Sequence, residues 1–457
     1  MADIGVLLAE VVGEAHVLAG DAVSEDYAHD ESLSAEPVLP AYVVRPSSAE
    51  EVAAVLRAAN ETGTPVTARG SGSGLSGSAI PRADGILVSF ERMNRVLEID
   101  TENHVAVVQP GVTLRELEER TAEVGLVYPV YPGELSASLG GNVATNAGGM
   151  RAIRYGVTRH QVLGLEAVLP TGEVIRTGGK FVKASTGYDL TQLIVGSEGT
   201  LALVTEAILK LQPRQSHQAT VLAPFADLTE VTRAVPRVVD SGVGPLILEF
   251  IDGFTMAAMI HTSDLQLGIP DQVRESSQAY LVVMLENRSA ERVEEDIAAV
   301  GELLTGLGAA DVYVLPGPSA RRLIEAREKA FFIAKAAGAD DVIDTVVPRA
   351  ALPEFFAKVL EIAQDNQTFI GGCGHAGDGN VHLAVFQKDP DVRYRVLHAL
   401  FETGIALGGA ISGEHGIGRE KKRHYLELED PTKVALLRRI KQAFDPNGIL
   451  NPGAIFD

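Results

Sequence analysis

The sequence has little cysteine and few positive charges, and each shortage removes a class of protein. Cys373 is the only cysteine among 457 residues, so no disulfide can form within the chain and a reducing compartment is expected. Lys and Arg total 39 against 61 Asp and Glu, which gives a net charge of −22. Long-range repulsion then opposes binding to nucleic acid or to an anionic membrane.

The sequence also lacks long apolar runs. No stretch approaches the roughly 18 uncharged apolar residues that suggest a membrane-spanning helix. The first twenty residues carry Glu10 and Glu14 inside their apolar stretch, which predicts an amphipathic helix and not a signal peptide. The cytoplasm is therefore the expected location, with peripheral attachment at the inner membrane face left open.

Composition and patterning predict an α+β protein with two main domains. Apolar residues make up 46% and charged residues 22%, which is ordinary for globular domains. We expect an N-terminal helical segment over 1–36, a first domain over 37–214, a second over 215–411 and a C-terminal helical segment over 412–457. The first domain opens with a strand–helix–strand pattern and continues in short strands, whereas the second alternates strands with longer helices.

A glycine-rich segment over 69–78, RGSGSGLSGS, contains the G-x-G-x-x-G spacing of dinucleotide-binding folds. That fold requires a helix directly after the loop, with its N-terminus facing the pyrophosphate. Here AIPRADGILVSF follows, which predicts a turn and another strand, so we reject a Rossmann domain. GGK at 178–180 likewise lacks the earlier glycine of a Walker loop.

Glycine-rich backbone can hold a phosphate without a helix, because successive N–H groups form an anion-binding nest. Two more such segments follow the first, SLGGNVATNAGG at 138–149 and GSEGT at 196–200. A tight turn explains any one of them. Three in one domain favour a phosphate-bearing ligand.

The second domain carries two motifs with chemically active side chains, GHAGDGNVH and GEHG. His375 and His382 are seven residues apart, but the GDG between them forbids a helix and predicts a hairpin that brings them together. Adjacent Glu414 and His415 point in different directions, so one can bind a metal while the other faces a substrate. Two histidines and one carboxylate suit a divalent ion with open positions, although separate structural roles remain the alternative.

RGSGSGLSG, GGNVATNAGGMRAIRYG and YDLTQLIVGSEGTLALVTE together resemble the FAD-binding domain of the vanillyl-alcohol-oxidase/p-cresol-methylhydroxylase superfamily. Within it, the chain resembles the branch of FAD-linked oxidases that holds the bacterial glycolate oxidase flavoprotein subunit and D-lactate dehydrogenase. The resemblance runs from about residue 38 to the C-terminus. It implies a two-part FAD-binding domain, an α+β substrate (cap) domain with an antiparallel sheet, and a C-terminal segment that returns to the FAD domain.

The resemblance implies FAD as the cofactor, with its pyrophosphate held by backbone amides of residues 69–77 and its isoalloxazine beside Val204. Some members tether FAD through a histidine in the first loop. This sequence has Ser73, Gly74 and Leu75 there, so we expect non-covalent FAD. The residues expected at the cofactor are Arg69, Gly70, Ser71, Gly72, Ser73, Gly74, Leu75, Gly133, Ser138, Gly141, Asn142, Thr145, Val204 and Asn451.

The resemblance also implies a metal site and a catalytic base. His375, His382 and Glu414 are the expected ligands of one zinc, manganese or iron ion, and His415 is the expected base. Arg327 matches the arginine that binds the substrate carboxylate, with a solvated charged helix face as the alternative. Cys373, near the motif, is expected to be a small buried residue.

The implied reaction is oxidation of a short D-2-hydroxy acid, such as D-lactate or glycolate, to the 2-oxo acid by hydride transfer to flavin N5. A quinone, a partner flavoprotein or an iron–sulfur subunit would accept the electrons. Val342 and Ala384 stand where relatives that act on D-2-hydroxyglutarate carry lysine and asparagine, which favours a short or apolar substrate side chain.

Three alternatives stay open at this point. They are a dehydrogenase of D-2-hydroxyglutarate or of longer 2-hydroxy acids, a non-catalytic electron-relay subunit, and the alkyl-transferring branch of the superfamily. The last uses a run of adjacent histidines that this sequence lacks. A homodimer is compatible with the sequence.

Overall fold

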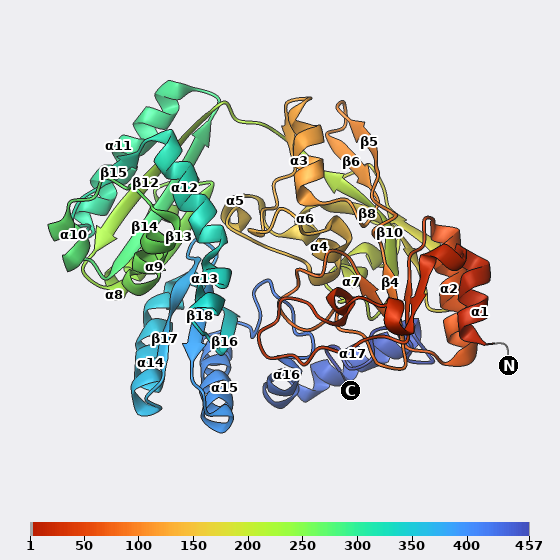
Figure 1. Cartoon of the computed structure of the whole chain (residues 1–457). Coiled ribbons are helices and arrows are strands. Elements are labelled where there is room, and N and C mark those ends of the chain that lie inside the picture. Colours follow the sequence, from red (N-terminus) through yellow and green to blue (C-terminus); the bar gives the residue numbers. More distant parts are fainter. Residues whose placement is uncertain (1–2, 457) are drawn as a thin grey trace.

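The strands of the protein form separate sheets in its two halves. In the computed structural model, which describes residues 3–456, there are four sheets, three of them built by the N-terminal half and one by the C-terminal half. Figure 1 shows the seven-stranded sheet with its helices, coloured green to blue, facing the orange and yellow N-terminal half. Helices α16 (Lys422–Leu428) and α17 (Pro431–Phe444) return beneath the N-terminal half.

The first sheet contains the predicted strand–helix–strand unit. Its elements are β2 (Tyr42–Val44), α2 (Ala49–Thr62), β3 (Val66–Arg69) and β4 (Ile86–Ser89), with β4 parallel to both β2 and β3. Helix α2 begins where the Ser48 hydroxyl accepts the amide N–H of Glu51, and it ends at Gly63 with φ +68°. The sequence therefore predicted this unit correctly.

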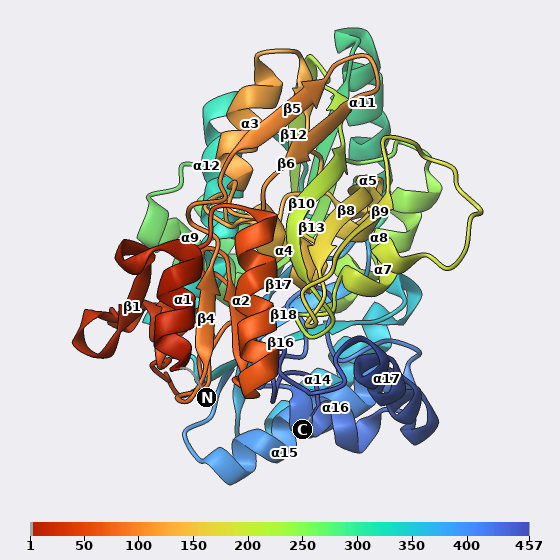
Figure 2. The same ribbon diagram turned by 90° about the vertical axis from the view of Figure 1, so that its right-hand side faces the viewer.

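The N-terminal segment, which we expected to be helical, is helical only in part. Helix α1 (Ile4–Val12) packs beside α2 in front of β4, as Figure 2 shows. Beyond short 3₁₀ turns, β1 (Val17–Ala19) pairs antiparallel with β2 and becomes the edge of the first sheet. Pairing with a strand outside the segment decides this, so no local helix pattern could show it.

The second sheet is a five-stranded antiparallel sheet. In spatial order its strands are β5 (Val96–Asp100), β6 (Val105–Val108), β10 (Leu203–Lys210), β8 (Val162–Val168) and β9 (Val174–Gly178). Strands β8 and β9 form a hairpin that turns at Gly172, which adopts φ +86°. Shorter elements complete this half: α3 (Leu114–Ala122), β7 (Leu126–Val127), α5 (Ala152–Tyr155), α6 (Thr158–Gln161), α7 (Leu190–Ile194) and β11 (Gln212–Pro213).

The second glycine-rich segment differs from the expected turn, because its first part is a helix. Helix α4 (Leu139–Thr145) contacts β10 and begins at Ser138, whose hydroxyl accepts the amide N–H of Gly141. Glycine is a poor helix former, so intrinsic preference argues against this helix. Burial of Leu139 and Val143 in the core of the second sheet stabilises it instead.

The C-terminal half is built on a seven-stranded antiparallel sheet, as expected. Its order is β15 (Tyr313–Leu315), β12 (His217–Phe225), β14 (Ala279–Asn287), β13 (Ile247–Asp252), β17 (Phe369–His375), β18 (Asn380–Phe386) and β16 (Asp341–Val346). One face packs in a common core with α8 (Leu228–Asp240), α11 (Ala290–Gly306), α14 (Leu352–Asp365) and α15 (Pro390–Ala406). The other face packs with α9 (Gly253–Ser263), α12 (Gly317–Glu328) and α13 (Ala330–Ala336).

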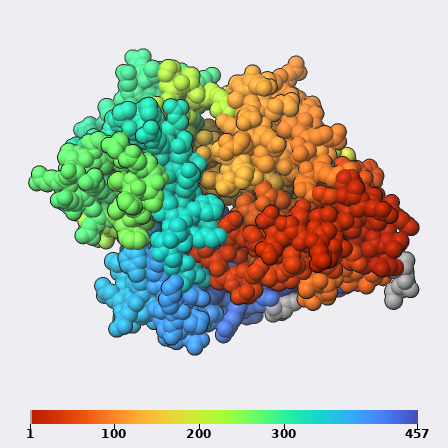
Figure 3. Space-filling model, in the orientation of Figure 1, coloured from red at the N-terminus to blue at the C-terminus, as the bar shows by residue number. Residues whose placement is uncertain are grey.

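Contacts along two seams hold the halves together. The backbone N–H of Val66 donates to the carbonyl of Ile449 (2.8 Å), so the C-terminal segment extends the first sheet. The ammonium of Lys335 pairs with Glu31 at 2.9 Å. Figure 3 shows cyan segments of the C-terminal half in contact with red segments of the N-terminal half on this face of the molecule. Within the described residues, no helix has both the length and the apolar character needed to span a membrane.

Candidate active site

A cavity between the two halves collects most of the predicted site residues. Its walls come from the 70–75 loop and α4 on one side and from β17, β18 and α13 on the other. The predicted ligands, His415 and Arg327 all line it. So do these predicted cofactor residues: Gly70, Ser71, Gly72, Ser73, Gly74, Leu75, Gly133, Ser138, Gly141, Asn142 and Thr145.

Three predicted cofactor residues lie behind the wall instead of in it. Val204 is buried on β10, where it packs in the core beneath α4. The guanidinium of Arg69 turns away to donate to the carbonyl of His29. The side-chain amide of Asn451 donates to the carbonyls of Ser78 (2.8 Å) and Glu198 (2.7 Å). These residues support the loops around the cavity. The local sequence does not distinguish a residue that lines the cavity from one that supports its wall.

The loop end of the cavity fits a phosphate-bearing cofactor. Backbone forms the wall at Gly70, because a Cβ there would overlap the Ser138 hydroxyl. No helix follows the loop, and the chain passes into β4, as the rejection of a Rossmann domain requires. The Asn142 amide nitrogen is buried and has no hydrogen-bond partner among residues 3–456. A cofactor that lies against α4 would supply the missing acceptor.

The predicted hairpin brings the two motif histidines together. Strands β17 and β18 pair so that Cys373 lies opposite His382, and the rings of His375 and His382 are 4.9 Å apart. The Nε2 atoms of both histidines lie 3.1 Å from Oε1 of Glu414. Two ligands that each sit about 2.1 Å from one ion are separated by about 3.0–3.4 Å, so the donor set fits a divalent metal.

Glu249 on β13 is a site residue that the motifs did not reveal. Its carboxylate lies 2.6 Å from Nδ1 of His375 and 2.7 Å from Nη2 of Arg327, and its side chain is 1% exposed. The contact makes Nδ1 of His375 a donor, so a metal would bind at Nε2 in place of the proton there. Although burial opposes it, the charges of Glu249 and Glu414 raise the pKa of His375 well above its ordinary value. A single acid inside the apolar run LILEFI was the available signal.

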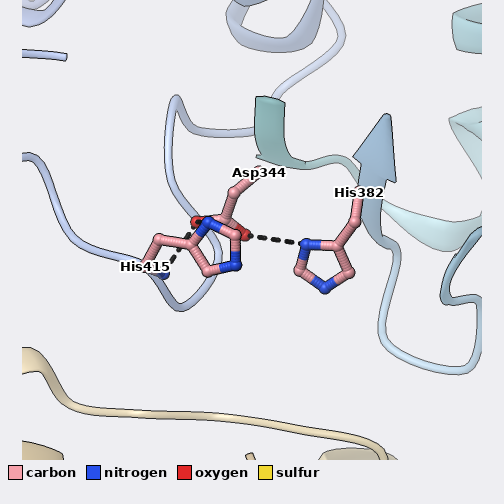
Figure 4. A group of neighbouring side chains, drawn as sticks. All are labelled: Asp344, His382 and His415. Carbon is pink, nitrogen blue, oxygen red and sulfur yellow. Dashed lines mark hydrogen bonds and ion pairs between the residues drawn. The ribbon is translucent and has the colours of Figure 1, made fainter. Parts of the chain in front are cut away.

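Asp344 on β16 is the second residue that sequence reasoning missed. Its carboxylate is fully buried and accepts hydrogen bonds from the Asn380 side-chain amide (2.9 Å), the Ser412 hydroxyl (2.6 Å) and the His415 backbone N–H (2.8 Å). Figure 4 shows it between His382 and His415. Burial opposes ionisation, but His415 and Lys421 outweigh it and hold the pKa of Asp344 far below its ordinary value.

Asp344, His382 and His415 are close enough to hold a metal themselves, but the carboxylate is already engaged. Its two oxygens accept hydrogen bonds from two side chains and from the backbone N–H groups of Glu414 and His415. Those bonds use the lone pairs that a ligand needs. Asp344 therefore positions the loop that carries Glu414 and His415.

His415 lies in the cavity wall as a neutral ring. Its imidazole stacks on that of His382, with 5.0 Å between centroids and 15° between planes. Burial lowers the pKa of His415 to about 4, so the ring is unprotonated at neutral pH and can accept a proton. Asp344, 3.9 Å from Nδ1, would stabilise the cation that forms.

The third glycine segment supplies a carboxylate to this loop. Glu198 adopts φ +53° and accepts the backbone N–H groups of Ile417 and Gly418, each at 2.8 Å. Burial raises the pKa of Glu198 to about 7, although both N–H donors oppose the shift. The N-terminal half thus holds the loop that carries His415.

Arg327 and Cys373 complete the buried group. Arg327 projects from α12 into the cavity, so it is not part of a solvated helix face. Burial raises the pKa of the Cys373 thiol to about 11, which keeps it protonated and unreactive. Cys373 is therefore the small buried residue that we expected.

Comparison with known proteins follows the same division of the chain. Residues 40–178 match the family described as FAD binding domain, and residues 214–455 match FAD linked oxidases, C-terminal domain. An uncharacterized FAD-linked oxidoreductase of Mycobacterium tuberculosis is 62% identical over 456 residues, covering 100% of this chain and 99% of that protein. A D-lactate dehydrogenase of Anaerostipes hadrus is 36% identical and covers 96% and 94%.

A glycolate oxidase subunit of Bacillus subtilis is 37% identical, covering 92% of this chain and 89% of that protein. Among solved structures, p-cresol methylhydroxylase superposes with a TM-score of 0.79 at 18% identity over 99% of this chain and 96% of that chain. The structural match supports the predicted p-cresol-methylhydroxylase type of fold. The two family matches and the relatives at 36–62% identity show that the chain belongs to the FAD-linked oxidase family and is an oxidoreductase.

Proposed function

We propose that the protein oxidises monocarboxylic D-2-hydroxy acids, of which glycolate and D-lactate are the smallest, to 2-oxo acids. The observation that carries the proposal is the convergence of His375 and His382 on Glu414, beside His415 and Arg327, in the cavity that the glycine loop also lines. These groups match the needs of the substrate, which are a proton acceptor for its hydroxyl, a cation for its carboxylate and a ligand set for a metal.

The proposed roles follow from the contacts. When bound, FAD supplies the hydride acceptor and a divalent ion held by His375, His382 and Glu414 lowers the pKa of the substrate hydroxyl. His415 accepts the hydroxyl proton, while the Cα hydrogen leaves with its electron pair. Arg327 binds the carboxylate with the edge of its guanidinium that Glu249 leaves free.

The two ends of the cavity are close enough for this reaction. A Cβ on Gly148, at the end of the second glycine segment, would lie 2.6 Å from Oε2 of Glu414. The backbone that lines the cofactor end therefore reaches the proposed metal ligands. An electron-relay subunit would need no such set of base and ligands, so the cluster favours catalysis on a substrate.

The relatives and the cavity wall narrow the substrate class. Two relatives are named D-lactate dehydrogenase and glycolate oxidase subunit, which supports 2-hydroxy acids as substrates. Val342 and Ala384 line the cavity, and neither can bind a second carboxylate. We therefore propose a monocarboxylic substrate, with a quinone, a flavoprotein or an iron–sulfur subunit as electron acceptor.

The test is anaerobic flavin bleaching by D-lactate, L-lactate, glycolate and D-2-hydroxyglutarate in the purified holoenzyme. We expect D-lactate or glycolate to bleach the flavin, and chelation or His415→Ala to slow bleaching by at least about 100-fold. His398→Ala is the matched control, because this histidine lies outside the cavity. A metal-loaded flavoprotein that none of the monocarboxylic acids bleaches would refute the proposal.

A further inference from the structure

Beside the histidine cluster, the strand register creates three successive rows of side chains. In the row of the cluster, Cys373 and Asp344 both lie opposite His382. Two residues further along, Gly371 and Val342 both lie opposite Ala384. In a third row, Phe369 lies opposite Phe386. Residues in register across antiparallel strands point to the same face, so all three rows share the face of His382.

The middle row is made of small or apolar residues, and Ala384 in particular leaves space in it. Four residues along a strand span about 13 Å, which is the distance from the histidine row to the phenylalanine row. Gly371 has no side chain and Ala384 has one methyl group, and both line the cavity with Val342. A pocket about one row deep thus continues from the proposed reaction centre along the sheet.

Aromatic rings close the far end of this pocket. Phe386 lines the cavity and lies 5.5 Å from the ring of Phe369 and 6.3 Å from the ring of Phe254. Ala258 on α9 and Phe331 on α13 add further apolar lining. Apart from Thr255 on α9, the lining residues of these strands and of α9 beside the phenylalanines offer hydrocarbon or glycine backbone.

One carboxylate lies on the pocket side of the middle row. A Cβ on Gly371 would come within 2.8 Å of Oδ2 of Asp252, so this carboxylate occupies the space that a side chain at residue 371 would fill. Its carboxylate accepts the backbone N–H groups of Thr255 (2.7 Å) and Gly372 (2.5 Å), and it is not among the residues that line the cavity. Asp252 therefore presents no hydrogen-bond donor to a second carboxylate on a substrate.

We propose that this side-chain pocket, formed by Val342, Gly371, Ala384 and Phe386, binds a branched or aromatic hydrocarbon group on the substrate. The inference rests on the proposed function and makes its substrate class narrower. The preferred substrates are 2-hydroxy acids with a bulky apolar side chain, and glycolate and D-lactate leave the pocket empty. Burial of each additional methylene stabilises the bound transition state, whereas a second carboxylate would lose its hydration without gaining a partner.

The experiment compares kcat/KM of the holoenzyme for glycolate, D-lactate, D-2-hydroxy-4-methylpentanoate, D-3-phenyllactate and D-2-hydroxyglutarate. We expect the two bulky acids to exceed glycolate by at least about 10-fold, with D-2-hydroxyglutarate lowest. Calorimetry gives an independent measurement, in which 4-methyl-2-oxopentanoate should bind more tightly than pyruvate.

Ala384→Phe fills the middle row and should reduce the ratio of kcat/KM for D-3-phenyllactate over glycolate by at least about 10-fold. The ratio within one variant cancels differences in folding and in FAD content. Leu360→Phe is the matched control, because it also introduces a phenylalanine but at an exposed position of α14. It should leave the ratio unchanged. If kcat/KM for glycolate or D-lactate equals or exceeds that for the two bulky acids, the side-chain pocket is overturned while the proposed function stands. Absence of bleaching by every 2-hydroxy acid would overturn both.

Discussion

At the end of the cavity lined by residues 70–75, the backbone forms the wall, whereas at the end lined by β17 and β18 side chains fill it. At Gly70 the wall is backbone alone, because a Cβ there has no room beside the Ser138 hydroxyl. The histidine cluster instead depends on buried carboxylates. Glu249 contacts His375, and Asp344 holds the loop that carries His415.

The two ends of the cavity should therefore tolerate different substitutions. Adding a methyl group to a glycine should disturb the loop end of the cavity, because the glycines there have no Cβ and leave no room for one. Removing a carboxylate should damage the cluster, because buried donors and charges then lose their acceptor.

Asp344→Ala should lower the free energy of unfolding by about 3–5 kcal/mol, because it removes the charge that buried Lys421 and the donors of Asn380 and Ser412 face. Urea unfolding of the holoenzyme measures the loss. The matched control is Asp84→Ala, whose carboxylate pairs at 3.0 Å with Arg82 on the surface, and about 0–1 kcal/mol is expected there. Equal losses in the two variants would contradict the role given to Asp344.

Glu198 lies where the two ends meet, and its titration should make stability depend on pH. Burial raises the pKa of Glu198 to about 7 from an ordinary value of 4.5. Between these values the folded protein binds more protons than the unfolded chain, so the free energy of unfolding falls as pH rises. The fall is at most about 1.4 kcal/mol per pH unit and ends above the folded pKa.

Glu198→Gln should remove this part of the slope, which a comparison of unfolding curves from pH 5 to pH 7.5 would detect. Glu206→Gln serves as the control, because this partly exposed residue lies on β10 outside the cavity. A slope that is unchanged in Glu198→Gln would show that another group titrates in this range.

Gly70→Ala should weaken FAD binding by about 5- to 150-fold, because the new methyl group overlaps the Ser138 hydroxyl and overpacking of this kind costs about 1–3 kcal/mol. Flavin fluorescence during titration of the apoprotein measures the dissociation constant. Gly74→Ala is the control within the same loop, since its Cβ would lie 3.4 Å from Asp30. Equal weakening by both substitutions would contradict a specific steric role for Gly70.

The same contrast explains which features the sequence reveals. The β17–β18 hairpin was predictable because a GDG turn and an alternating strand are local patterns. Glu249 lies 126 residues from His375, and only the pairing of β13 with β17 brings them together. Helix α4 also escaped prediction, since its glycines oppose a helix that tertiary packing stabilises. Resemblance predicted a group of cofactor residues, most of which line one cavity, but it did not show that Arg69, Val204 and Asn451 lie behind the cavity wall.

Glu249→Gln tests whether the cluster depends on a charge that no motif contains. The substitution keeps the size of the side chain but removes the carboxylate between His375 and Arg327. Loss of such an orienting partner lowers metal affinity by about 10- to 100-fold, and competition with a chromogenic chelator measures it for zinc. Glu286→Gln is the matched control, because this partly buried acid on β14 lies away from the cluster. Its carboxylate accepts a hydrogen bond from the Tyr155 hydroxyl at 3.0 Å. If both variants bind zinc as tightly as the parent protein, Glu249 serves only to neutralise Arg327. The histidine cluster would then not depend on this buried carboxylate, contrary to the difference drawn between the two ends of the cavity.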